Sequence, residues 1–165
     1  MKRLLTGVLV GLALAILPVG ASAASQITEY LNGVETGVPP PCVGGSTSPF
    51  SGTAQGSLQG IWWASICHGG LPNADIFSGT FTLQTPSRQV RGYFQPQQGG
   101  VHFTDEWHFA GACQQHYTVR GPLSNTVSGL SNGSFNATLT HYGGYYWGSC
   151  HVFSARVSGT ASLLA

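Results

Sequence analysis

The residues of this chain that could perform chemistry are histidines and a few acids. Asp105 lies between Phe103 and Trp107 in a segment where apolar and polar residues alternate, so the alternation predicts an inward carboxylate. Corresponding positions of other alternating segments hold His68, His141 and His151. A carboxylate and imidazoles that face one interior can share hydrogen bonds as a structural polar cluster, or line a pocket. A β-bulge would instead turn Asp105 to solvent.

A second ionisable group lies on the opposite face of the same segment. If Phe109 and Cys113 flank a tight turn, Glu106 faces His116, and His108 lies two residues along on the same side. Directly opposed side chains have Cβ atoms about 5 Å apart. Two histidines and a glutamate are a known zinc ligand set, so this register predicts a metal site. The alternative is a solvated polar face.

Aromatic residues gather beside predicted turns. Trp62 stands at the start of the first strongly patterned strand, and Tyr145 and Trp147 follow Gly143-Gly144. Such rings bind sugars and apolar ligands, and the mouth of a barrel is a usual ligand site. The alternative is packing in a core or interface. The predicted ligand-binding residues are Trp62, Asp105, His141, Tyr145, Trp147 and His151.

The four cysteines are even in number and permit three pairings. Two disulfides are expected, and the favoured pairs are Cys42–Cys67 and Cys113–Cys150. The first pair would attach a Pro-rich segment to the first strong strand, and the second would join two later strands. A structural zinc site is the competing interpretation, but the sequence has no CxxC pair.

The first 23 residues have the pattern of a secretory signal peptide. Lys2 and Arg3 precede an apolar run, and Ala21-Ser22-Ala23 supplies a small-residue cleavage pattern. The run is shorter than the roughly 20 residues that a membrane span needs, and no second run follows. We therefore expect a secreted or periplasmic protein, with no membrane span after cleavage.

The remaining chain carries few charges. Beyond residue 23 it has four arginines, no lysine and five acidic residues. A nucleic-acid-binding protein normally presents a basic patch, so this class of partner is not predicted. No cofactor is predicted either.

The alternation that places these residues is that of β-strands. Runs of period two, separated by Gly-, Pro- and Asn-containing turns, continue from about Leu58 to the end of the sequence. They predict an all-β antiparallel meander barrel of roughly seven or eight strands, with a β-sandwich as the alternative. Gly60-Ile61-Trp62 resembles the Gly-x-Trp of lipocalin-type and avidin-type barrels, over those three residues only. The predicted organisation is a signal peptide (1–23), an irregular Pro/Gly-rich arm (24–56) and a β-domain (57–165).

These observations favour an exported, non-enzymatic β-domain. It would bind a small or extended ligand, such as a carbohydrate-like molecule, or serve as a surface or envelope component. One alternative is a hydrolase or metal-dependent enzyme that uses histidine with Asp105 or Glu106. These two acids are adjacent in a strand and face opposite sides, which argues against a glycosidase pair. Another alternative is a purely structural interaction module.

Overall fold

The computed structural model describes residues 25–37, 40–127 and 131–164, and within these ranges the chain forms strands and turns without a helix. The predicted signal peptide lies outside the described residues. No helix in the described ranges could cross a membrane. The strands are β1 (Gln26–Glu35), β2 (Pro41–Cys42), β3 (Gly45–Gly56), β4 (Gly60–His68), β5 (Asn73–Gln84), β6 (Gln89–Phe94), β7 (Gly100–Phe109), β8 (Ala112–Val127), β9 (Ser131–Tyr146) and β10 (Ser149–Leu164).

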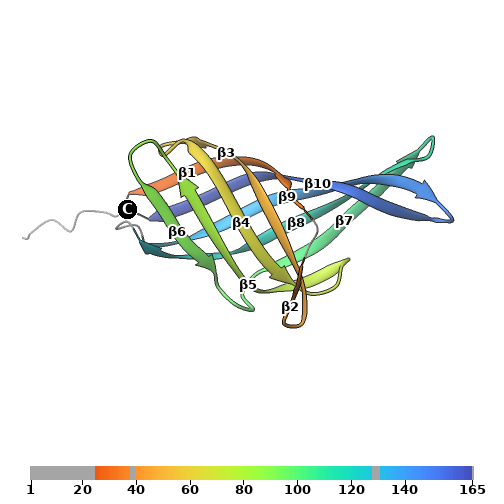
Figure 1. Cartoon of the computed structure of the whole chain (residues 1–165), viewed down its shortest axis with the longest axis horizontal. Coiled ribbons are helices and arrows are strands. Elements are labelled where there is room, and N and C mark those ends of the chain that lie inside the picture. Colours follow the sequence, from red (N-terminus) through yellow and green to blue (C-terminus); the bar gives the residue numbers. More distant parts are fainter. Residues whose placement is uncertain (1–24, 38–39, 128–130, 165) are drawn as a thin grey trace, which may run out of the picture.

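The strands belong to one antiparallel sheet whose pairings close into a ring (Figure 1). The order around the ring is β1-β10-β9-β8-β6-β5-β4-β3, and β1 also pairs with β3. Strand β2 pairs with β3, and β7 pairs with β5 and β8. The all-β antiparallel prediction is confirmed, and the pairing is ring-like, with β8 rather than β7 next to β6.

The arm expected over 24–56 is not irregular over the residues that the structure describes. It supplies β1 and β3, which pair with each other over seven residue pairs from Glu29↔Gly56 to Glu35↔Phe50. The alternation of apolar and polar residues is hard to recognise in this segment, because many of its side chains are small. An ideal Cβ on the inward Gly33 would stand 2.5 Å from Cζ2 of Trp62, so the indole of β4 occupies the space that a side chain would need. The glycine at position 33 therefore reflects tight packing against Trp62.

Two hairpins extend beyond the ring. Figure 1 shows β7–β8 and β9–β10 running to the right of the other strands, and β8 and β9 remain paired there at Ala112↔Gly144. We call these four paired strand ends the extension. The turn residues Ala110, Gly111, Trp147 and Gly148 all have positive φ, the backbone geometry that tight hairpin turns require.

Both favoured disulfides are present. Cys42–Cys67 joins β2 to β4, and Cys113–Cys150 joins β8 to β10. The second bond spans β9, since Cys113 pairs with Gly143 on that strand. A Cβ at Gly143 would stand 3.1 Å from Sγ of Cys113 and 2.3 Å from the carbonyl oxygen of His151. The glycine therefore leaves room for the bridge.

Candidate functional site

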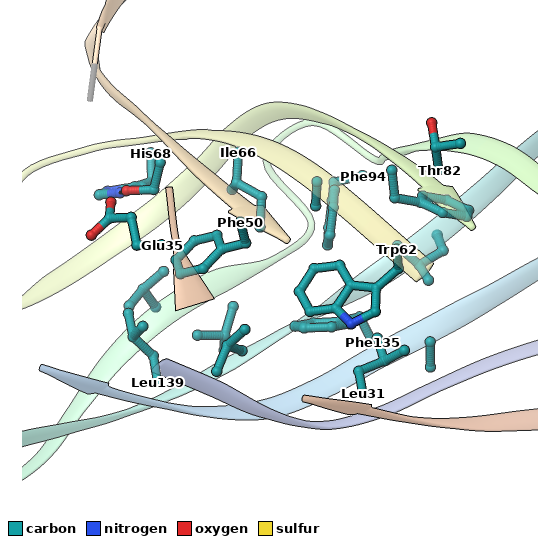
Figure 2. A pocket seen from close by; sticks show the side chains of 18 of the residues that line it. Leu31, Glu35, Phe50, Trp62, Ile66, His68, Thr82, Phe94, Phe135 and Leu139 are labelled. Carbon is teal, nitrogen blue, oxygen red and sulfur yellow. The ribbon is translucent and has the colours of Figure 1, made fainter. Parts of the chain in front are cut away.

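The inner faces of the strands enclose a cavity of about 260 Å³. Its walls are mainly apolar, with Leu31, Phe50, Phe94 and Leu139 among them, and Figure 2 shows these side chains pointing into a shared space. Polar side chains are concentrated at its two ends. All of the lining residues except Leu71 lie on paired strands, so the cavity is formed by the fold itself.

Trp62 supplies one wall of the cavity. Its side chain is 5% exposed, and its Nε1 donates to the carbonyl oxygens of Thr53 at 3.1 Å and Asn32 at 3.3 Å. These bonds hold the indole from two neighbouring strands and satisfy its only donor. The ring can therefore offer an apolar surface without leaving a buried polar group unpaired.

One end of the cavity is polar and contains Glu35, Ser48, His68 and His141. His68 Nδ1 lies 2.8 Å from the carbonyl oxygen of Gly69, which can only accept, so Nδ1 carries a proton. Its Nε2 lies 3.1 Å from the Ser48 hydroxyl. Figure 2 shows Glu35 and His68 at the same end of the cavity, away from Trp62.

His141 is a partly buried polar group at this end. Its Nδ1 is buried without a hydrogen-bond partner, and its ring centroid lies 4.9 Å from that of Tyr117. Burial lowers the pKa of the imidazole below its usual value, and the nearby His68 lowers it further. His68 and His141 both lie on the inner face, as the alternation of their strands indicates.

Glu29 provides the polar group at the other end. Its side chain is 2% exposed, and Oε1 accepts a hydrogen bond from the backbone N–H of Leu58 at 2.6 Å. The second oxygen, Oε2, is buried with no partner. The sequence analysis does not identify Glu29 and Glu35 as site residues, because the composition of 24–56 indicates an arm. The alternation of Ile27, Glu29 and Leu31 is the signal that could have identified Glu29.

Asp105 does not face the interior. A bulge at Thr104 shifts the pairing, so Phe103 pairs with Tyr117 whereas Asp105 pairs with His116. This extra residue moves the carboxylate to the outer face, where its side chain is 59% exposed and contacts Nδ1 of His116. The inward position expected for Asp105 is therefore wrong.

The predicted metal ligands do not share a face. The hairpin register pairs Glu106 with Gln115, one residue away from the expected partner His116. Glu106 and His108 remain neighbours, with 3.8 Å between Oε1 and Nδ1, but His116 lies on the opposite face with Asp105. No three histidine, cysteine or acidic side chains of the described ranges are grouped to hold a metal ion.

The other predicted ligand-binding residues lie on the extension. Tyr145 stacks on His108 with centroids 4.1 Å apart, and His151 stacks on Tyr146 at 3.8 Å. A bulge at Phe153 breaks the alternation that would have placed His151 in the interior. Trp147 occupies the β9–β10 turn and is 91% exposed. Of the predicted ligand-binding set, the structure brings Trp62 and His141 to the cavity and leaves the rest outside it.

A polar chain lines the inner face of the extension beside the cavity. The Tyr117 hydroxyl donates to Gln115 Oε1 at 3.0 Å, and Gln115 Nε2 donates to Glu106 Oε2 at 2.8 Å. Burial raises the pKa of Tyr117, and the negative charge of Glu106 raises it further. The tyrosine is therefore held as a neutral hydrogen-bond donor.

Comparisons of the chain with protein-family models, with curated proteins and with solved structures found no match.

Proposed function

We propose that this protein binds a small, largely apolar molecule inside its ring of strands. The observation that carries the proposal is the cavity of about 260 Å³ with its mainly apolar walls. A cavity of roughly 150 Å³ lined by apolar side chains already admits benzene. The space between Trp62, Phe50 and Leu139 is thus large enough for a ligand of more than one ring or a medium-length alkyl chain.

Packing energetics support a bound molecule. Side chains that line a void lose the dispersion contacts that a filled core would give them, and water gains little in an apolar space. A ligand of matching shape restores those contacts. The lining includes Leu71 and Val152, which are also partly exposed at the surface. The end of the cavity that holds Glu35 and His68 therefore offers a route of entry.

The proposal includes export to an oxidising compartment. The two disulfides are consistent with such a location, because bonds of this kind persist mainly in secreted or periplasmic proteins. The signal-peptide pattern of residues 1–23 points the same way. A binding protein of this type would meet its ligand outside the cytoplasm.

A fluorescent probe and a pair of tryptophan variants test the proposal. The neutral dye N-phenyl-1-naphthylamine should show saturable fluorescence enhancement with the mature protein. Ala64 is buried and lines the cavity, whereas Ile61 of the same strand is exposed on the outer face. Ala64→Trp should therefore abolish the enhancement by filling the space, and Ile61→Trp should leave it unchanged.

Circular dichroism and thiol titration of both variants establish that each has folded and formed its disulfides. Absence of saturable binding in the wild type would contradict the proposal. Unchanged binding in folded Ala64→Trp would also contradict it, because the dye would then occupy some other surface.

A further inference from the structure

The side chains of the cavity lining that carry a permanent charge are acidic. Its lining includes the carboxyl groups of Glu29 and Glu35, but no lysine or arginine among the described lining residues. Burial lowers the pKa of the His141 imidazole and so disfavours a positive charge on it. An anionic ligand would therefore approach carboxylates in surroundings of low dielectric, where like charges repel strongly.

Glu29 has an unused acceptor. Its Oε1 is occupied by the N–H of Leu58, while Oε2 is buried and unpaired. A buried polar atom without a partner is costly, and native structures contain few of them. Since folding has already removed Glu29 from water, a ligand donor that met Oε2 would not incur the desolvation cost of the carboxylate again.

We propose that the ligand is an apolar molecule bearing an amine, and that the amine pairs with Glu29. This inference rests on the proposed function and adds the ligand's polar group and its orientation. The ammonium group enters first and meets Oε2 of Glu29, and the apolar body lies along Leu31 and Trp62. Carboxylate-bearing amphiphiles of the same size are excluded by charge.

The spacing along β1 supports this orientation. Glu29 and Glu35 both face inward and are separated by six residues, or roughly 20 Å in an extended strand. The two carboxyl groups therefore mark opposite ends of the cavity. Glu35 shares its end with Ser48, His68 and the unpaired Nδ1 of His141, whereas the unpaired carboxylate oxygen lies at the Glu29 end.

A series of ligands with one tail and three head groups tests the inference on the unaltered protein. n-Octylamine, n-octanol and n-octanoate are titrated at pH 7 by calorimetry and by displacement of N-phenyl-1-naphthylamine. Octylamine should bind more tightly than octanol, and more tightly than octanoate by about tenfold or more. Equal affinities, or a preference for octanoate, would overturn the amine assignment while leaving a binding cavity. Failure of the dye and of all three ligands to bind would instead overturn the proposed function.

Variants then locate the amine. Glu29→Gln keeps an oxygen for the Leu58 N–H but removes the charge, so the preference for octylamine over octanol should disappear while octanol still binds. Glu106→Gln makes the same change outside the cavity and should keep the preference. Loss of the preference in Glu35→Gln with retention in Glu29→Gln would overturn the orientation. If Glu29→Gln does not fold, the wild-type head-group series still decides the ligand class, and a spin-labelled octylamine locates the amine by its paramagnetic effect on the Glu29 and Glu35 amides.

Discussion

Oε1 of Glu29 accepts a hydrogen bond from the backbone N–H of Leu58 at 2.6 Å and so connects β1 to the turn between β3 and β4. Glu29→Ala should lower the free energy of unfolding by about 1–3 kcal/mol, because the Leu58 donor loses its partner. Glu29→Gln keeps an acceptor oxygen and should lose less. Urea denaturation measures both changes. Equal losses in the two variants would show that the bond to Leu58 is not what stabilises this turn.

Gly143 should not tolerate a side chain. A Cβ there would stand 2.3 Å from the carbonyl oxygen of His151 and 3.1 Å from Sγ of Cys113, so β9 and β10 would have to separate. We expect Gly143→Ala to lower the free energy of unfolding by about 1–3 kcal/mol. Gly70→Ala is the matched control, since a Cβ at Gly70 would meet nothing within 4 Å. Thermal unfolding of the two variants provides the comparison, and similar melting temperatures would refute the expected clash.

Acidification should destabilise the fold through His141. Burial and His68 lower the pKa of this imidazole in the folded protein, whereas the unfolded chain takes up the proton near the usual value of 6.5. As pH falls below about 6.5, the unfolded state therefore binds more protons and the free energy of unfolding decreases. His141→Gln should flatten this dependence between pH 7.5 and about 5. A wild-type slope in His141→Gln would exclude His141 as the cause.

Asp105→Asn should have little effect on stability. The Asp105 carboxylate is solvent-exposed and its contact with His116 lies on the outer face of the extension. Exposed ion pairs contribute about 0–1 kcal/mol, so the loss measured by urea denaturation should fall within that range. Binding of N-phenyl-1-naphthylamine should be unchanged. A loss of several kcal/mol would indicate that the carboxylate is held in the interior after all.

Period-two alternation predicted much of the fold and part of the site. It identified the inward positions of Trp62, His68 and His141, and cysteine placement identified both disulfides. These inferences succeeded because long strands with regular pairing preserve the alternation from one end to the other. In such strands, knowing that one residue faces inward is enough to predict which of its neighbours face inward.

Two physical features explain where period-two alternation gave wrong predictions. Single extra residues at Thr104 and Phe153 reverse the alternation, and nothing in their side chains marks them as bulges. The strands within 24–56 are missed for another reason. Their glycines and serines are typical of a linker, and the Trp62 indole that occupies the space beside Gly33 belongs to a different strand, β4. Glu29 and Glu35 were missed together with that segment.

The contact between Gly33 and Trp62 has a consequence for what the cavity can recognise. Strand β1 carries both carboxyl groups, and a slip of two residues would preserve its inward alternation while moving each carboxyl group by about 7 Å. Such a slip would bring Leu31 or Glu35 against the indole, where only a glycine fits. The close contact of Gly33 with Trp62 thus fixes the register of β1, and in the proposed complex it would fix the depth at which Glu29 meets the ligand's amine.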